Sequence, residues 1–454
     1  MKCFNSFASF FGLLSVSIIT LLTSSCSDTD YVSAIPGNSI ALMSVDASAT
    51  DVSKSQEDML KSILGTYKVG DTGIDFGSKI YFFETIDGNI GACAKVKDGD
   101  DMADFFNRLS SKGKCEKIKE HDGIRFTVLS NSWVIGFSDD ALLAIGPVAV
   151  PEQAEARHSI GKYLKQDEDR SIVSSKIYER LDSVDSPVAF VAQTQALPEK
   201  FIAPFTLGAP KDADASQIYI AAGISKKGNS IEIDGKSFSF DKSIDAALNK
   251  SMNVFRPIKG MYKKMADSSP LELYANVDGK QFLPLLQNNK TLQVLLAGAN
   301  TAIDMNKIIQ SIDGDLFVGT GGMDADNMNM EMAAELSDTD WLKDVGYWMS
   351  SCPSGSRIVP DKKAGTYKYI NGKTVFDFGV TADKRHFFFK NANASTAATG
   401  KKRTDASNNR IKGQRFVIVL NLEKMEKDNK VVKTAMHIMK PLLGEVKTVT
   451  YMVK

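Results

Sequence analysis

Cys26 is the residue whose type and position most directly indicate chemistry, because its thiol stands where an apolar run gives way to polar sequence. Lys2 is the only charged side chain before Asp28, and residues 7–22 are apolar apart from Ser, Thr and Gly. A short basic start, an apolar middle and small residues before a cleavage point are typical of a secretory signal. We therefore interpret residues 1–25 as a signal peptide.

The residues before Cys26 read Leu21-Leu22-Thr23-Ser24-Ser25 and resemble a bacterial lipobox. In such a box the Cys receives diacylglycerol and becomes the new N-terminus, so the resemblance implies lipidation of Cys26. Thr23 departs from the pattern, which usually has an aliphatic residue three positions before the Cys. The alternative is an ordinary secretory signal in which Cys26 occurs by chance.

The residues that follow, Ser27, Asp28 and Asp30, resemble the acidic export signals that send Bacteroidetes lipoproteins to the outer face of the outer membrane. We predict that residues 26–35 form a tether. The alternative reading of the residues after Cys26 is that they are simply a solvated stretch with two acids and carry no export signal. We expect a lipid-anchored outer-membrane protein, on the cell surface or on the periplasmic face. The signal's apolar run of about 16 residues is shorter than the roughly 20 that span a bilayer, so no transmembrane helix is predicted in the mature chain.

The charge balance excludes several classes of partner. The chain has 55 basic and 55 acidic side chains, and removal of the signal takes away only Lys2, which leaves 54 against 55. A dedicated nucleic-acid binder would show a basic surplus, so we predict no nucleic-acid partner. The same balance argues against a polybasic membrane patch, and the lipid is the expected link to the membrane.

The histidines do not form a metal pattern. No two of the four lie within ten residues of each other, and no HExxH motif occurs. We interpret them as isolated surface residues and predict neither a metal site nor a cofactor. They are His121, His158, His386 and His437.

Two Gly-Lys-Ser/Thr triplets, residues 235–237 and 372–374, lack the earlier Gly that a P-loop requires, because Ser230 and Tyr367 stand there. Both triplets are expected in hairpin turns.

Residues 324–335 superficially suggest a calcium loop, but the fifth and sixth positions of an EF-hand would be Met328 and Asn329. A polar turn is the better interpretation.

The remaining cysteines of the mature chain are Cys93, Cys115 and Cys352, an odd number with wide spacing. A Cys93–Cys115 disulfide is one interpretation in an oxidising compartment, and three buried or half-buried thiols are the preferred one.

A pair of carboxylates of the glycosidase type, distant in sequence, is not excluded by the sequence. Only three Trp are present, however, so few aromatic side chains of this kind could stack on a sugar. No catalytic residue is therefore predicted.

An internal repeat is the most informative feature of the body. Strand-like residues 40–46 and 271–278 both end in Val-Asp, and residues 94–100 align with 334–340 at a constant offset of 240. Apolar stripes with helical spacing follow, Met59 to Leu64 and Met305 to Ile312 after the first pair, and Met102 to Leu109 and Trp341 to Trp348 after the second.

These patterns predict an α+β fold of two related halves, each a mostly antiparallel sheet with helices packed on one face. The first half spans residues 36–245 and the second 268–454, joined by a helical connector at 246–267. Hairpin turns are expected at Asp87-Gly88, Asp122-Gly123, Asp234-Gly235 and Asn371-Gly372. Residues 393–413 are poor in apolar side chains and are expected to be a mobile surface loop.

The signal, Cys26, the opening Ile35 to Asp46 and the later Trp133 to Asp140 together resemble a Bacteroidetes outer-membrane lipoprotein family of unknown function. The resemblance implies no active site. The leading hypothesis is a non-catalytic surface lipoprotein that binds a protein or glycan partner or serves envelope assembly. The alternative is a carbohydrate-binding or carbohydrate-processing surface lipoprotein, which a pocket with several carboxylates and aromatic faces would favour.

Overall fold

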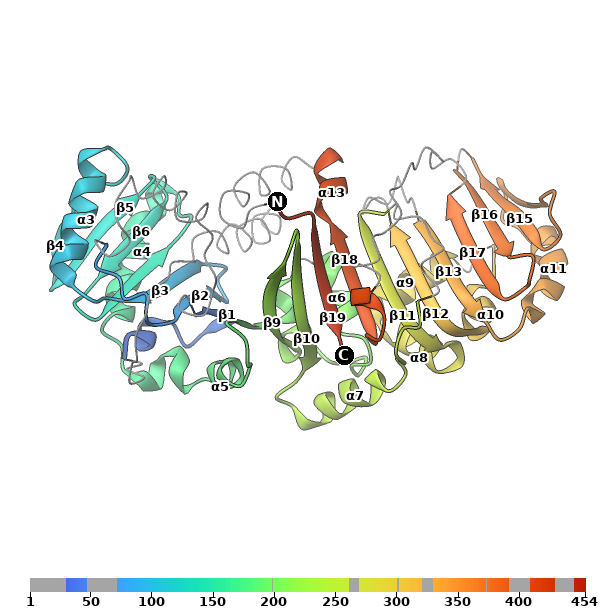
Figure 1. Cartoon of the computed structure of the whole chain (residues 1–454), viewed down its shortest axis with the longest axis horizontal. Coiled ribbons are helices and arrows are strands. Elements are labelled where there is room, and N and C mark those ends of the chain that lie inside the picture. Colours follow the sequence, from blue (N-terminus) through green and yellow to red (C-terminus); the bar gives the residue numbers. More distant parts are fainter. Residues whose placement is uncertain are drawn as a thin grey trace. The chain divides into compact units, whose positions relative to one another are not determined.

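The computed structural model describes residues 30–46, 72–197, 199–260, 269–299, 302–320, 330–372, 374–391, 409–428 and 445–454. The chain forms two compact units. Within the described ranges, unit 1 comprises residues 30–197 and 219–229, and unit 2 comprises residues 199–218, 230–428 and 447–454. Each unit contains a mostly antiparallel sheet with helices, as the α+β prediction requires (Figure 1).

The sheet of unit 1 is antiparallel throughout its described pairs, with the order β9-β8-β1-β2-β3-β7-β6-β5-β4. All seven residues of β1 are buried, which fits a central strand with covered faces. The strands are β1 (Ser39–Val45), β2 (Ile80–Thr85), β3 (Ile90–Lys95), β4 (Lys119–His121), β5 (Ile124–Leu129), β6 (Trp133–Phe137), β7 (Ala141–Ile145), β8 (Val188–Gln193) and β9 (Tyr219–Lys227).

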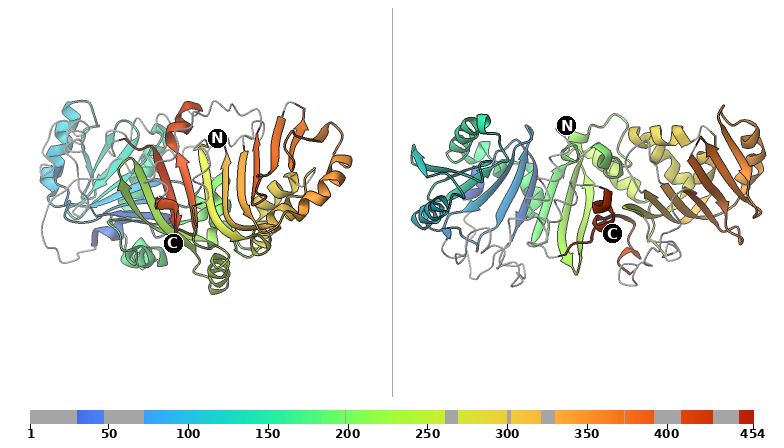
Figure 2. Two further views of the ribbon diagram at one scale, coloured as in Figure 1. Left: turned by 45° about the vertical axis from the view of Figure 1, so that its right-hand side comes forward. Right: turned by 90° about the horizontal axis from the view of Figure 1, so that it is seen from above.

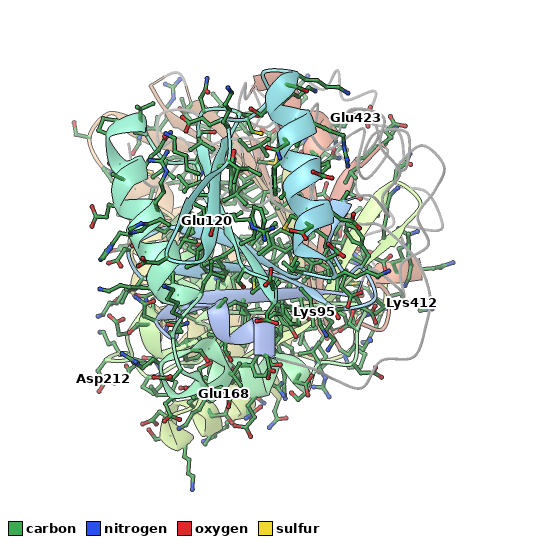
Figure 3. The ribbon with its side chains drawn as sticks, turned by 90° about the vertical axis from the view of Figure 1, so that its left-hand side faces the viewer. Lys95, Glu120, Glu168, Asp212, Lys412 and Glu423 are labelled. Atoms are coloured by element: carbon green, nitrogen blue, oxygen red, sulfur yellow. The ribbon has the colours of Figure 1, made fainter. Side chains whose placement is uncertain are left out.

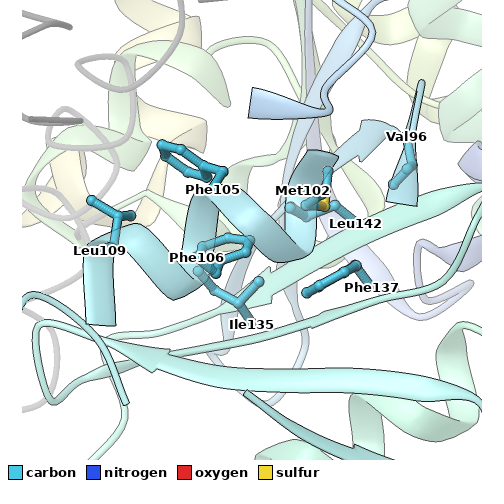
Figure 4. Packing of buried hydrophobic residues seen from close by; sticks show 8 residues of the cluster. All are labelled: Val96, Met102, Phe105, Phe106, Leu109, Ile135, Phe137 and Leu142. Carbon is cyan, nitrogen blue, oxygen red and sulfur yellow. The ribbon is translucent and has the colours of Figure 1, made fainter. Parts of the chain in front are cut away.

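Helix α3 (Gly99–Ser111) forms where the apolar stripe predicts a helix. The Asp98 carboxylate accepts the N–H groups of Asp100 and Asp101 and so caps the first turn. The buried face of α3 packs on alternate residues of β6 and β7, with the rings of Phe106 and Phe137 stacked 5.6 Å apart (Figure 4). This cluster is the core of the β4–β7 region, and it consists of Val96, Met102, Phe105, Phe106, Leu109, Ile135, Phe137 and Leu142.

Helix α4 (Gln153–Tyr163) covers the opposite face of the same strands. Gly136 lies between Ile135 and Phe137, so its face is opposite to the one under α3. A Cβ at Gly136 would lie 2.5 Å from Ile160 of α4, so the glycine allows the helix to approach closely. The prediction that helices pack on one face is therefore wrong for unit 1, because β6 is apolar on both faces and both require cover.

The first described element, η1 (Asp30–Ala34), is packed against unit 1. Tyr31, Val32 and Ala34 are buried, and the Tyr31 hydroxyl donates to the Lys79 carbonyl at 2.6 Å. Gln166 donates to the carbonyls of Ser33 and Ile35. Residues 30–35 are therefore not a solvated tether, because their apolar side chains are covered and their carbonyl oxygens have partners.

Short helices complete unit 1. α5 (Lys176–Asp182) packs on β1 and β8. The others are η3 (Val150–Glu152), η4 (Glu168–Arg170), η5 (Ile172–Ser174) and η6 (Thr194–Ala196). Acidic and basic side chains are interspersed among the described residues of this unit, including Lys95, Glu120 and Glu168 (Figure 3).

The sheet of unit 2 has the order β10-β19-β18-β11-β12-β13-β17-β16-β15-β14. Figure 1 labels most of these strands, and Figure 2 shows the ribbon from two further sides. Only β10 and β19 pair in parallel among these described pairs. The strands are β10 (Ser230–Phe238), β11 (Leu271–Asp278), β12 (Ile312–Thr320), β13 (Met330–Leu336), β14 (Ser356–Pro360), β15 (Thr366–Asn371), β16 (Thr374–Val380), β17 (His386–Asn391), β18 (Phe416–Asn421) and β19 (Thr448–Val453).

The helices of unit 2 include the one predicted from its Trp spacing. Trp341 and Trp348 lie stacked 6.1 Å apart, and Trp341 meets the Phe387 ring of β17 edge-on at 5.8 Å. The elements are α6 (Glu199–Phe205), η7 (Ala215–Gln217), α7 (Lys242–Met252), α8 (Gly279–Asn288), α9 (Lys290–Ala299), α10 (Met305–Gln310), η10 (Asp340–Asp344), α11 (Val345–Ser350) and α13 (Leu422–Asp428).

The strand order of unit 1 recurs in unit 2. From β11 to β19, each strand has the same neighbours as the strand numbered ten lower in unit 1, from β1 to β9. The central position of β1 between β2 and β8 thus corresponds to that of β11 between β12 and β18. β10, α6 and α7 lie outside this shared order.

Three of the four expected turns join strands, and one does not. Asp87-Gly88, Asp122-Gly123 and Asn371-Gly372 lie between paired strands, and these three glycines have positive φ. Asp234-Gly235 lies inside β10, where Asp234 still pairs with Met452 of β19. That expectation is wrong because the parallel partner keeps the strand extended past the turn-like dipeptide.

In the described part of the predicted connector, residues 246–260, only the start is helical. α7 ends at Met252, and residues 253–260 are largely extended, with Phe255 bridging to Val277. Most of the expected loop at 393–413 lies outside the described residues, as does the apolar stripe from Met59 to Leu64. The end of that loop, residues 409–413, contains a helical turn whose Ile411 is buried with β11 and β18, so it is packed rather than mobile.

None of the described helices is both long and apolar enough to cross a membrane.

We predict that Phe137→Ala lowers the free energy of unfolding by about 3–5 kcal/mol, because the ring is fully buried and its loss leaves a cavity under α3. Ile86→Ala is the matched control, since that side chain is largely exposed and should change stability by about 0.5 kcal/mol or less. Urea unfolding followed by circular dichroism measures both. Equal stability of the two variants would contradict the packing of α3.

Candidate functional site

The residues predicted to carry lipid and export chemistry lie at the start of the chain. Cys26, Ser27 and Asp28 fall outside the described residues. Asp30 is the first residue of η1 and is exposed. The structure therefore places Asp30 on the surface of unit 1, while the lipidation of Cys26 stays a prediction.

The described histidines are dispersed. His121 lies exposed in β4, His158 lies exposed on α4, and His386 begins β17, where its ring is 3.6 Å from the carboxylate of Asp383. His437 falls outside the described residues. Among the described residues, no group of three or more His, Cys, Asp or Glu could hold a metal ion.

The phosphate-like triplets differ from their expected setting. Residues 235–237 lie in β10 and not in a hairpin turn, whereas Gly372 does occupy the turn between β15 and β16. Residues 324–329 of the calcium-like segment fall outside the described residues. Neither described glycine precedes a helix, which a phosphate-binding loop of the P-loop type requires.

Cys93, Cys115 and Cys352 are free thiols, so the alternative Cys93–Cys115 disulfide is not formed. Cys93 is fully buried, donates to the Tyr31 carbonyl at 3.3 Å, and burial raises the pKa of its thiol. Burial also raises the pKa of Cys115. The two thiols are thus poor nucleophiles near neutral pH, since the thiolate is the reactive form.

Unit 2 contains a buried polar network at the point where residues 253–260 cross the sheet. The Asp315 carboxylate accepts the N–H groups of Lys259 at 2.9 Å and Gly260 at 2.6 Å, and the side-chain amide of Asn276 at 2.8 Å. Arg256 donates to Asn276 Oδ1 and forms a 2.7 Å ion pair with Asp313. Because both oxygens of Asp315 already accept hydrogen bonds, this network anchors the connector and offers no unengaged base.

The other buried acids of unit 2 are too far apart for glycosidase chemistry. Glu232 of β10 and Glu272 of β11 lie in one cross-strand row, with Thr450 and Val419 between them. Three strand spacings separate their backbones by about 14 Å. Glycosidase carboxyl groups lie roughly 5–9.5 Å apart, so this pair does not have the separation that the reaction needs.

A pocket lies within unit 2. It is lined in part by residues of the parallel strands β10 and β19, which Figure 1 labels. Its walls are mainly apolar, and four of the eleven lining residues are aromatic. Phe205 meets Tyr451 edge-on at 4.9 Å, and Phe255 meets Phe416 at 5.5 Å. The cavity volume is about 30 Å³, and none of its eleven lining residues is acidic, His or Cys. Its lining is therefore mostly apolar, with Lys236, Ser237 and Tyr451 as the residues that carry polar side-chain groups.

Local interactions hold the walls of the pocket in place. The Asp241 carboxylate caps α7 by accepting the N–H groups of Ser243 and Ile244, and the hydrogen bond from the Ser243 hydroxyl and these backbone bonds lower the pKa of Asp241. At the other end of α7, Arg415 donates to the carbonyls of Phe255 at 2.8 Å and Met252 at 3.4 Å. A cation at this end also complements the helix dipole.

Two polar side chains of the pocket are unengaged. Lys236 is exposed and Ser237 is half-buried, and neither side chain has a hydrogen bond or ion pair within the described structure. Asp234, two residues earlier, is paired with Lys454. Both residues line the pocket, but they are consecutive in β10, so their side chains point to opposite faces of the strand.

Sequence reasoning missed this pocket. Lys236 and Ser237 were noticed only as part of a P-loop-like triplet, and the aromatic walls come from segments more than 200 residues apart, Phe205 and Tyr451. No fixed spacing links such residues. The only sequence signal is that α6, β10 and α7 stand outside the repeat.

A family model described as "Domain of unknown function (DUF4836)" matches residues 46–416, which is more than half of the chain. No curated protein and no solved structure matches this chain.

We predict that Asp315→Asn weakens the anchoring of the connector and lowers the free energy of unfolding by about 1–3 kcal/mol, because the amide nitrogen cannot accept from Lys259 or Gly260. Asp313→Asn is the control, since its ion pair with Arg256 is partly exposed and should contribute about 1 kcal/mol or less. Hydrogen exchange of the peptide containing residues 253–260 reports the change directly. Equal exchange in the two variants would contradict the anchoring role.

We predict that Cys93 resists alkylation by a maleimide at pH 8 until the protein unfolds, because it is buried and its pKa is raised. Cys352 is only half-buried and should react in the native protein. Mass spectrometry of the peptides after timed labelling measures each site. Labelling of Cys93 as fast as Cys352 would show that the core around η1 opens readily.

Proposed function

This chain belongs to the family described as "Domain of unknown function (DUF4836)", and from that premise we propose that it is a non-catalytic binding protein of a bacterial outer membrane, anchored by a lipid on Cys26. The family assignment brings no activity with it. The observation that carries the binding role is the pocket of unit 2, which has apolar walls and no acid, His or Cys. Such a site can retain a ligand, and it contains none of the carboxylate, imidazole or thiol groups that most often carry catalysis.

We further infer that the two units derive from one duplicated module. The shared strand order of β1–β9 and β11–β19 supports this, together with the Val-Asp ends of β1 and β11. The pocket is lined partly by α6, β10 and α7, which lie outside the shared strand order. This fits a binding protein in which a site has been built onto a duplicated module. A protein or glycan partner on another surface is compatible with the same frame.

A carbohydrate-processing role has less support. It would need a pocket that collects carboxylates beside its aromatic faces, and the pocket of unit 2 contains only the aromatic faces. A hydrolase screen and a glycan array with residues 27–454 would test this alternative, and a reproducible hit would revive it.

We predict that Cys26→Ser moves the protein from the detergent phase to the aqueous phase in phase partitioning of whole-cell extracts, because the variant has no thiol to accept the lipid. Cys3→Ser is the matched control and should stay in the detergent phase, since Cys3 precedes the apolar run. A Cys26→Ser protein that stays in the detergent phase would contradict the anchor. Protease treatment of intact cells distinguishes surface display from the periplasmic face.

A further inference from the structure

One face of the unit 2 sheet carries a row of four charged side chains on the neighbouring strands β13, β17, β16 and β15. The four pair directly across the strands, and we call them the charge row: Glu331, Lys390, Asp377 and Lys368. We propose that the charge row is a contact surface through which two copies of this chain associate. Neither the pocket nor the lipid takes part in this contact.

The same row in unit 1 is apolar and buried. The constant offset of 240 that aligns residues 94–100 with 334–340 places Glu331 where unit 1 has Gly91. Across the strands from Gly91, the row of unit 1 continues with Ile145, Val134 and Val128. These three side chains are buried on the face that α4 covers, because Val134 is two residues from Gly136. Unit 1 thus covers with its own helix the face that carries charges in unit 2.

Unit 2 has no counterpart of α4 among its described elements. α4 follows β7 in unit 1, whereas β17 is followed by residues 392–408, whose only apolar side chains are those of Ala. The helical turn that begins at 409 packs on β11 and β18. η10 and α11 pack on the other face of the sheet, where Trp341 contacts Phe387. The charge row therefore faces solvent, with Lys390 exposed and Asp377 half-exposed.

The order of charges in the row is self-complementary. From β13 to β15 the signs are negative, positive, negative and positive. A second copy placed face to face, with a two-fold axis parallel to the strands and midway between β17 and β16, presents the same row in reverse. Glu331 then faces Lys368 of the second copy, and Lys390 faces its Asp377. Packed sheet faces lie about 10 Å apart, a distance that a lysine and a carboxylate side chain can bridge together.

Apolar side chains beside the charge row also favour contact. Phe388 lies two residues before Lys390 and so shares the face of the row. Val375 lies two residues before Asp377 and shares that face on the other side of the row, because β16 and β17 are antiparallel. Both are half-buried, and a second copy would remove more of their surface from water. Within one copy, Lys368 and Asp377 form an ion pair of 2.7 Å, which holds opposite charges at adjacent places of the row.

The size of the face indicates a weak dimer. Four strands about 4.8 Å apart, each with about five residues at a rise of about 3.3 Å, present roughly 300 Å² in plan. A standard stable interface buries about 800 Å² on each partner. We therefore expect a monomer–dimer equilibrium with a dissociation constant of about 10–200 µM.

Sedimentation velocity of residues 27–454 from about 5 to 300 µM measures this equilibrium. The sedimentation coefficient should rise with concentration at low salt. The dissociation constant should increase at least about fivefold between roughly 50 and 500 mM NaCl, because exposed charges are screened. A native chain that stays monomeric throughout would overturn the proposal.

Charge reversal at the centre of the row tests whether this surface forms the contact. Lys390→Asp and Asp377→Lys each place like charges opposite each other at two symmetry-related positions, and each should weaken association at least about tenfold. Lys362→Asp is the matched control and should change nothing, because that lysine is exposed in the turn between β14 and β15, outside the row. Circular dichroism checks that every variant folds. Equal association of the control and the row variants would place any dimer contact elsewhere and overturn the proposal.

Mixing the two row variants separates a contact between copies from a contact within one copy. In a mixed dimer, the negative centre of the Lys390→Asp chain faces the positive centre of the Asp377→Lys chain, so opposite charges meet again. The mixture should associate within about threefold of the native dissociation constant, although each variant alone is mainly monomeric. A mixture as weak as the separate variants would overturn the proposal, because ion pairs within one copy cannot be restored by another copy.

Discussion

Each sheet depends on a central strand whose backbone is hydrogen-bonded on both edges. β1 is buried along its whole length, so its N–H and C=O groups have no water to bind and must pair with β2 and β8. β11 stands in the same position between β12 and β18. One neighbour of each central strand comes from a segment more than 100 residues later, β8 for β1 and β18 for β11. Backbone pairing of the central strands therefore joins segments that are far apart in the sequence.

Many of the strands and helices could be predicted from sequence because they rest on local patterns. Alternating apolar strands, the Val-Asp ends and the helical stripes from Met102 to Leu109 and Trp341 to Trp348 are each visible within a dozen residues. Asp234-Gly235 failed as a turn signal because its conformation is set by β19, more than 200 residues later. The cover on both faces of β6 was missed for a related reason: a short apolar run does not reveal how many partners it has.

The pocket could not be predicted from local sequence patterns. Its walls are formed by Phe205, Phe255 and Tyr451, which share no period and meet only because added elements close over the end of the sheet. The network around Asp315 has the same character, since one carboxylate joins the connector to two strands. Contacts between buried side chains that are far apart in the sequence are the hardest part of a fold to predict from one sequence. In this protein such contacts anchor the connector and form the walls of the pocket.

If Cys26 carries a lipid, the packing of η1 limits how far unit 1 can lie from the membrane. The first described residue, Asp30, already belongs to η1, and it is four residues after Cys26. Four extended residues span at most about 14 Å, which is less than half of the roughly 30 Å thickness of a bilayer's hydrocarbon core. With a lipid on Cys26, unit 1 would lie against the lipid headgroups and have little freedom to rotate. The surface around η1 would then be inaccessible to large macromolecules. Any partner would have to approach from the flanks or from the side facing away from the lipid.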